Sequence, residues 1–233
     1  MRMIAIISDI HANFAALEAV IQDSKKKGCT DYICLGDIAG YHSEINEVIE
    51  LLRNLENLRF ILGNHDVYLI EKTGCPRSKL LTSILRYQEK SIKPDNLQWL
   101  TSGELFIREG DTLFAHGGPE DTQEQYLYKI EEKIFPPGTR RIFGGHTHVQ
   151  KVINLGKKQF CNPGSVGQPR DGDPRAAYAI LNEDKILLQR VTYDIKKTQA
   201  VMKDAGFPEH CYLNLSEGAQ IGGRVDNIKL IKR

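Results

Sequence analysis

The sequence has no excess of charge of either sign. Its 233 residues include 31 Lys or Arg and 30 Asp or Glu, which gives a formal net charge of +1. A chain without a strong basic field lacks the attraction to phosphate backbones on which most nucleic-acid binding depends. Polymeric nucleic acid is therefore not expected as a partner, whereas a nucleotide stays open as a small substrate.

Long apolar runs and paired cysteine motifs are also missing. The apolar run at residues 3–7 is too short for a membrane helix or a signal peptide, and no later run is longer. The five cysteines form an odd set without a Cys-x-x-Cys motif, which argues against a disulfide framework and against a zinc ribbon. These features predict a cytoplasmic protein without a membrane partner, and they leave the oligomeric state open.

The first half of the chain alternates between short apolar runs and segments with helical spacing. Strands are predicted at residues 3–8, 32–35 and 60–62, and the helices between them are expected to have Asn13 and Ser43 as N-caps. This β-α-β-α-β order predicts a parallel sheet with right-handed crossovers.

The middle is more helical, and the second half is richer in strands. Helices are expected around residues 80–85, from Pro94, and at 194–203, whereas residues 120–138 are predicted to be a loop or capping segment. The later strands are predicted at 104–108, 112–115, 141–143, 150–155, 176–181 and 186–191. No repeat or linker is evident, so residues 1–233 are predicted to form one domain, with 206–233 as a poorly defined extension.

Polar side chains, usually beside a glycine, follow five of the predicted strands. The segments are Asp9-Ile10-His11, Gly36-Asp37, Gly63-Asn64-His65-Asp66, His116-Gly117-Gly118 and Gly145-His146-Thr147-His148. Five of the seven histidines lie in them, a concentration that unrelated helix caps and core histidines would not produce. Because alternate residues of a strand project to one face, Asp9 and His11 are predicted to point at one place beyond the strand. Carboxylates, imidazoles and an amide oxygen are a ligand set for Mn²⁺, Fe²⁺, Ni²⁺ or Zn²⁺.

In this order, the five motifs resemble those of the calcineurin-like metallophosphoesterase superfamily, and most of all its small YfcE-type phosphodiesterase-like members. The motifs span residues 9–148, and the stretch 162–170 resembles the same members. The resemblance implies an α/β fold, a four-layer α/β/β/α sandwich with two mixed sheets flanked by helices. It also implies hydrolysis of a phosphate ester.

Carried over position by position, the resemblance implies two divalent metal ions. Mn²⁺ is the first candidate, with Fe, Ni, Zn or Mg as alternatives. The implied metal ligands are Asp9, His11 and His148 for one ion, Asn64, His116 and His146 for the other, and Asp37 for both. A hydroxide between the ions would attack phosphorus, and His65 would be the general acid for the leaving oxygen.

Several assignments near this site stay open. Arg170 and His42 are candidate substrate contacts, and Asp66 could orient His65 or cap the next helix. Protein phosphatases of the superfamily have Asp and Arg where this chain has Gly40 and Tyr41. That departure favours small diesters or nucleotides over phosphoproteins. A non-catalytic metal-binding scaffold of the same fold is the other alternative.

Overall fold

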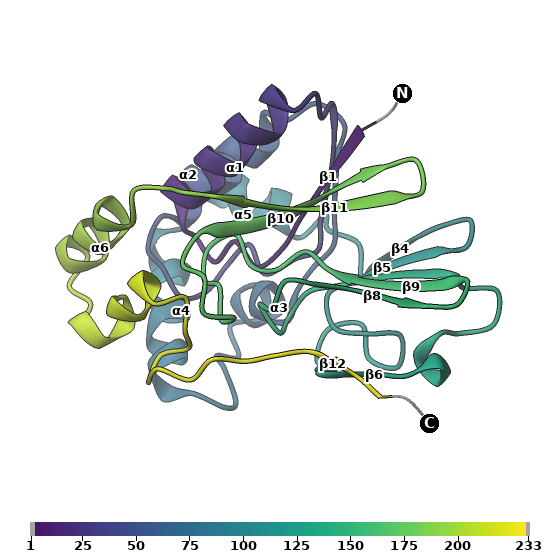
Figure 1. The fold of residues 1–233 in the computed structure, drawn as a ribbon. Helices are drawn as coiled ribbons and strands as arrows, with labels where there is room; N and C mark the ends of the chain where they lie inside the picture. Colours follow the sequence, from purple (N-terminus) through teal and green to yellow (C-terminus); the bar gives the residue numbers. More distant parts are fainter. Residues whose placement is uncertain (1–2, 232–233) are drawn as a thin grey trace.

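Two five-stranded mixed sheets face each other in the computed structural model, which describes residues 3–231 (Figure 1). The first sheet has the order β11-β10-β1-β2-β3. Its strands are β1 (Met3–Ile7), β2 (Asp31–Cys34), β3 (Leu58–Phe60), β10 (Ala176–Asn182) and β11 (Lys185–Val191). The three N-terminal strands pair in parallel, as their alternation with helices predicted.

The second sheet has the order β4-β5-β7-β9-β8. Its strands are β4 (Phe106–Glu109), β5 (Thr112–Ala115), β7 (Arg141–Gly144), β8 (Lys151–Leu155) and β9 (Lys158–Asn162). β5, β7 and β9 run in parallel, and β4 and β8 are antiparallel edges. β9 was not predicted, because it begins with polar Lys158 and Gln159 and only its last three residues are buried.

Helices flank the sheets and complete the predicted fold class. They are α1 (Phe14–Lys26), α2 (Ile45–Arg53), α3 (Asn64–Glu71), α4 (Lys79–Ser91), α5 (Pro94–Leu100) and α6 (Ile195–Asp204). Alternation along β1 explains the layers: Ala5 and Ile7 pack in a core with helical residues, whereas Ile4 and Ile6 pack against the second sheet. Among the described residues, no helix combines the length and apolar character needed to span a membrane.

The outer face of the second sheet is covered by the predicted capping segment and by the end of the chain. Residues 120–138 contain β6 (Lys129–Ile130) and the 3₁₀ turn η1 (Glu132–Ile134). β12 (Lys229–Leu230) pairs in parallel with β6, and buried Ile228 joins the same apolar cluster. The C-terminal residues are therefore part of the packed structure up to Ile231.

Two local predictions need correction. Ser43 does not cap α2; the N-cap position is Glu44, and it makes no side-chain capping bond. The third strand ends at Phe60, two residues before the predicted end, because residue 61 forms only an isolated bridge with Glu104. The Asn13 cap is confirmed, since its side chain accepts a hydrogen bond from the backbone N–H of Ala16.

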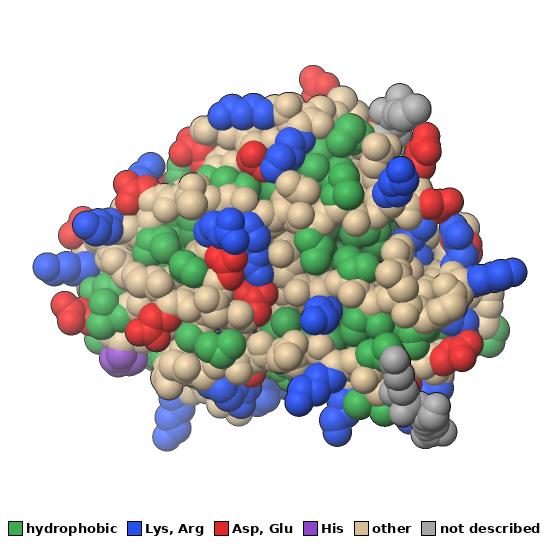
Figure 2. Space-filling view, in the orientation of Figure 1, with side chains coloured by type: hydrophobic (Ala, Val, Ile, Leu, Met, Phe, Trp, Pro, Cys, Tyr) green, Lys and Arg blue, Asp and Glu red, His purple; other side chains and the backbone are tan. Residues whose placement is uncertain are grey.

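Figure 2 shows basic and acidic side chains interspersed over most of one face, in keeping with the balanced composition. Its lower edge, where the C-terminal segment runs in Figure 1, carries mainly Lys and Arg.

Candidate metal centre

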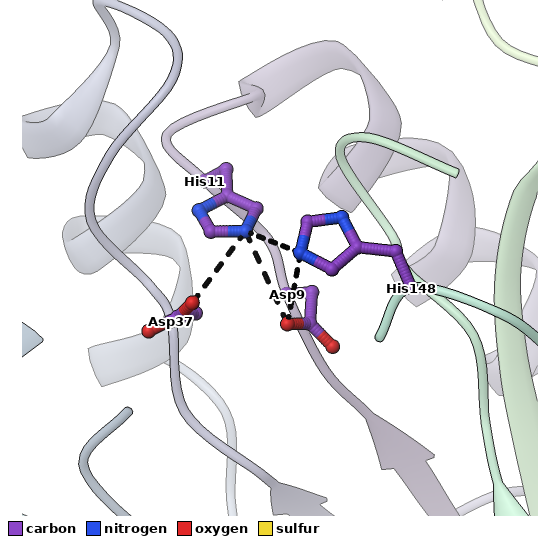
Figure 3. A group of neighbouring side chains, drawn as sticks. All are labelled: Asp9, His11, Asp37 and His148. Atoms are coloured by element: carbon purple, nitrogen blue, oxygen red, sulfur yellow. Dashed lines mark hydrogen bonds and ion pairs between the residues drawn. The ribbon is translucent and has the colours of Figure 1, made fainter. Parts of the chain in front are cut away.

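The loops that follow five strands bring their polar side chains together beyond the strand ends. These loops lie after β1, β2, β3, β5 and β7 and supply Asp9, His11, Asp37, Asn64, His116, His146 and His148. All seven residues are at most 3% exposed. Four of them, drawn in Figure 3, point toward one another from three separate loops. Buried carboxylates and imidazoles of this kind need hydrogen bonds or a cation to offset the loss of hydration.

A left-handed backbone, rather than strand alternation, aims the first motif. β1 ends at Ile7, and Asp9 and His11 have φ values of +54° and +52°. Asp37, His146 and His148 have positive φ as well, at +53°, +62° and +58°. Each such residue costs about 1–2 kcal/mol. Strain of this kind persists where the surroundings over-determine it, and it is typical of functional sites.

The backbone bonds that hold these turns cross between loops. The N–H of Asp9 donates to the carbonyl oxygen of Gly36 at 3.0 Å, and that of His11 donates to the carbonyl of Asp37 at 2.9 Å. Glycine is required at one close approach, because a Cβ on Gly63 would lie 2.2 Å from Asp37 Oδ1. The motif glycines therefore let two loops touch directly behind the carboxylate.

The first group of candidate ligands consists of Asp9, His11, Asp37 and His148, whose ligand atoms lie within 4.8 Å of one another. Nδ1 of His11 lies 2.7 Å from the carbonyl oxygen of Ala39, and Nδ1 of His148 lies 2.7 Å from that of Gln168. Carbonyl oxygens only accept, so each Nδ1 carries the proton and each Nε2 carries a lone pair. The two Nε2 atoms face each other at 3.1 Å. Two lone pairs so close repel, and a cation between them removes the conflict, so these residues fit a metal ion.

The second group shares Asp37 with the first. Nε2 of His116 lies 3.1 Å from Asn64 Oδ1, 3.1 Å from His146 Nδ1 and 3.3 Å from Asp37 Oδ2. The other nitrogen of His116 faces the carbonyl oxygen of Leu35 at 2.9 Å. Asp37 Oδ2 is also 3.7 Å from His11 Nε2 in the first group. One carboxylate oxygen thus stands between two sets of buried donors.

Burial and neighbouring charges shift the pKa values of the candidate ligands. Burial raises the pKa of Asp9 to about 6. Burial also acts to raise the pKa of Asp37, but the charges of His116 and His65 outweigh it and hold that pKa well below its usual range. Burial alone would lower the pKa of His116, yet Asp37 raises it to about 9. The charge of Asp37 therefore favours a proton on His116.

His65 lies beside the two groups without joining either. Its Nε2 is 3.9 Å from Asp37 Oδ2, and its backbone N–H donates to Asp37 Oδ1 at 2.9 Å. Its Nδ1 is buried and has no hydrogen-bond partner among the described residues; a Cβ on Gly40 would lie 2.2 Å from it. Burial lowers the pKa of His65 to about 4. Asp66 accepts hydrogen bonds from the backbone N–H groups of Gly63 and Ala39, which is a capping role.

Residues outside the motifs hold the loops in place. Gln88 of α4 accepts from the N–H of Gly40 at 2.8 Å and donates to the carbonyls of Gly40 and His42. Asn162 donates to the Gly145 carbonyl and to Thr147 Oγ1, so it holds the turn that carries His146. Gln88 was missed, because nothing in a helical sequence marks which polar residue turns inward.

A cavity of about 480 Å³ opens beside His65. Arg170 lines it and is 7% exposed; its Nη2 donates to the Tyr41 hydroxyl at 2.9 Å, and its guanidinium lies over the Tyr41 ring. His42 is not among the lining residues. It is 1% exposed, and its Nδ1 lies 2.7 Å from the carbonyl oxygen of His11. The structure therefore places His42 behind the His11 loop, where it supports that loop instead of facing a substrate.

Tyr126 and Tyr128 also line the cavity, although the sequence did not single them out. The Tyr126 ring lies against His146 with centroids 3.9 Å apart, and Tyr128 stacks on Tyr126 at 5.6 Å. The only hint in the sequence was their position within the predicted capping segment.

The chain is similar to known proteins over most of its length. The model of the calcineurin-like phosphoesterase superfamily domain matches residues 1–185. The uncharacterized protein MJ0912 of Methanocaldococcus jannaschii is 38% identical over 231 residues, which cover 89% of this chain and 94% of that protein. A crystal structure of a metallophosphoesterase from Sphaerobacter thermophilus has 36% identity and a TM-score of 0.81, and the match covers 93% of this chain and 99% of that one.

A partial match concerns the symmetrical bis(5'-nucleosyl)-tetraphosphatase of Neisseria gonorrhoeae. It is 32% identical over 122 residues, which cover 48% of this chain and 42% of that enzyme.

Proposed function

This chain belongs to the calcineurin-like phosphoesterase superfamily, and from that membership and the site we propose that it is a metal-dependent hydrolase of small phosphate esters or nucleotides. A phosphodiesterase activity is the first choice. The tetraphosphatase that matches half of the chain acts on a nucleotide by its name, which supports this substrate class. The five cysteines are all buried free thiols, the form that a reducing compartment preserves, and the cytoplasm is the proposed location.

The observation that carries the proposal is the pair of donor groups that share Asp37. One ion would be held by Asp9, His11, Asp37 and His148, and the other by Asp37, Asn64, His116 and His146. When bound, two divalent ions supply Lewis-acid polarisation of a phosphoryl oxygen and acidify a water molecule. Mn²⁺ is the proposed metal, since carboxylate and carbonyl oxygens suit it, and the imidazoles leave Fe, Ni and Zn as alternatives.

His65 is proposed to donate the proton that the leaving oxygen needs. Its ring lines the cavity next to both donor groups, yet its nitrogens are not required as ligands. The ring is held in place by stacking on Tyr41, with centroids 5.2 Å apart. A bound phosphate would add negative charge beside the imidazole and so favour its protonated form.

Arg170 is proposed to bind the reacting phosphate. Its guanidinium is buried and has no carboxylate within ion-pair distance among residues 3–231; its Nε also lacks a hydrogen-bond partner there. A buried unpaired cation is costly, so the arrangement is best explained by an anion that binds beside it. An arginine fork matches the geometry of two phosphate oxygens.

The protein-phosphatase alternative is disfavoured by the room around His65. The superfamily's phosphoprotein-specific members have Asp where this chain has Gly40, and even a Cβ at that position would lie 2.2 Å from His65 Nδ1. The scaffold alternative needs neither a buried histidine at the cavity beside both donor groups nor a buried arginine without an ion pair, and His65 and Arg170 fit these descriptions.

The test combines metal analysis with turnover. Protein stripped with a chelator and reloaded with Mn²⁺ is expected to bind about two ions per chain. It should also hydrolyse bis-p-nitrophenyl phosphate in a metal-dependent manner. Asp37→Asn should lose both properties, whereas Asp184→Asn, a surface control 73% exposed, should keep them. Two bound ions without turnover of any ester would support the scaffold instead, and metal-independent turnover would refute the proposed site.

A further inference from the structure

The cavity beside His65 extends beyond what the reacting phosphate needs. At about 480 Å³ it falls in the range of pockets that hold whole small molecules. Its walls come from the loop before α4, from the Tyr126 region and from the C-terminal segment, here residues 218–228. The part of a substrate that extends away from the reacting phosphate therefore has to fit between these walls.

The lining of the cavity carries basic side chains without acidic ones among the described residues. Among the described residues that line the cavity there are three arginines, Arg77, Arg170 and Arg224, and no Asp or Glu. Carboxylates pair with two of them from outside the lining: Arg77 Nη2 lies 2.6 Å from Glu124, and Arg224 Nε lies 2.9 Å from Asp226. A guanidinium has five N–H donors, so these ion pairs orient each side chain and leave further donors for an anion.

The C-terminal segment is hydrogen-bonded to the loop that carries Arg170. The N–H of Asp226 donates to the carbonyl of Arg170 at 2.7 Å, and the Tyr128 hydroxyl donates to the Asp226 carboxylate at 3.1 Å. Gly172 N–H donates to the Gly218 carbonyl at 3.0 Å. Arg224 is thus carried on a loop that is tied at both ends to the wall of the cavity. Figures 1 and 2 show that the edge along this segment is mainly basic.

We propose that this cavity is a subsite for a second phosphate group of the substrate, bound between Arg77 and Arg224. The proposal rests on the proposed hydrolase function and deepens it. It assigns to the enzyme substrates with at least two phosphate groups, one at the metal centre and one in the arginine subsite. The stacked Tyr126 and Tyr128 form the adjoining apolar wall. The C-terminal segment is then a specificity element of the enzyme.

The experiment compares kcat/KM on p-nitrophenyl phosphate, tripolyphosphate and ATP for Mn²⁺-loaded enzyme. Wild type should prefer both polyphosphates. Arg224→Gln should reduce kcat/KM on the polyphosphates about tenfold more than on p-nitrophenyl phosphate, mainly through KM, because a charge-assisted hydrogen bond is lost at a partly exposed side chain. The double variant Arg77→Gln/Arg224→Gln should widen that difference.

The matched control is Arg175→Gln. The Arg175 side chain is exposed like that of Arg224 (49% against 67%) and also pairs with an Asp two residues away, Asp173, but it does not line the cavity. It should leave all three rates unchanged. Equal losses on all three substrates in Arg224→Gln, or no loss on any, would overturn the subsite. So would a wild type that does not prefer polyphosphates.

Two further comparisons show which part of the substrate the cavity recognises and which of the two proposals has failed. Tripolyphosphate as good as ATP means that phosphate groups alone are recognised, and ATP better than tripolyphosphate means that the tyrosine wall also contacts the base; both support the subsite. If bis-p-nitrophenyl phosphate, p-nitrophenyl phosphate and every polyphosphate are inert with metal bound, the hydrolase proposal itself fails. Turnover of bis-p-nitrophenyl phosphate or p-nitrophenyl phosphate without any polyphosphate preference refutes only the subsite.

Discussion

The proposed acid role of His65 can be tested by changing the leaving group. His65→Gln keeps a side chain in the space beside Gly40 but removes the titratable ring. Tyr126 and Tyr128 of the cavity are poor replacements for that acid, because burial raises the pKa of Tyr126 and raises that of Tyr128 to about 12. We therefore expect the full loss of a positioned acid, about 10³-fold in kcat, for an ester with an alkoxide leaving group such as a nucleoside 5'-monophosphate.

For p-nitrophenyl phosphate the same variant should lose less than about fivefold, because nitrophenolate leaves as a stable anion without a proton. His210→Gln, an exposed histidine outside the cavity, is the matched control and should not change either rate. Metal content and thermal unfolding should match wild type. Equal losses on the two esters would refute the reasoning, because a structural effect acts on both.

The pH dependence gives an independent reading. Burial lowers the pKa of His65 to about 4, so its protonated fraction falls as the pH rises above that value. The ratio of kcat/KM for the alkoxide ester to that for the nitrophenyl ester should therefore fall between pH 5 and pH 8 in wild type. Metal loss affects both esters and cancels in the ratio. In His65→Gln the ratio should be flat, and a slope there would assign the acid to another group.

Three other outcomes follow from the site. Mn²⁺ should raise the Tm of chelator-treated protein more at pH 8 than at pH 5. At pH 5 protons on Asp9 (pKa about 6) and His116 (pKa about 9) compete more strongly with the metal. Differential scanning fluorimetry measures the Tm shift, and an equal shift at both pH values contradicts the prediction. Gly40→Ala should cost about 1–2 kcal/mol in urea unfolding for its φ of +92°, and it should mimic His65→Gln on alkoxide esters because it displaces that ring; wild-type rates would refute this. Arg170→Met should raise KM at least about tenfold on all esters while the Tm of the metal-free protein stays equal or rises; a large drop in Tm would show that the arginine is structural.

Much of this protein can be derived from its sequence. Alternating apolar and helical segments predicted the parallel half of the first sheet, and the predicted cap Asn13 lies where its helix begins, although Ser43 does not cap α2. The same pattern placed polar residues just after strands, and the edge of an α/β sheet brings strand ends together. Residue types and order were therefore enough to show the resemblance to the superfamily, and that resemblance implied the candidate ligands.

The local conformation that makes the ligands converge was not derivable. Strand alternation predicted that Asp9 and His11 share a face, but these residues lie beyond β1, and left-handed φ values aim them. Positive φ is uncommon for any residue other than glycine, and hydrogen bonds between the loops hold Asp9 and His11 in it. The strand β9 was likewise not predicted, because its pairing with β7 and β8, rather than its own composition, defines it.

The sequence by itself thus determined the order of the motifs and their residue types, since periodicity and residue type are local properties. Tertiary structure alone decided which distant residues complete the site: Gln88 behind the Gly40 turn, Tyr126 against His146, and Arg224 in the wall of the same cavity as Arg77. These residues carry no local signal, because a glutamine, tyrosine or arginine on a helix or loop acquires its role only from what packing places beside it.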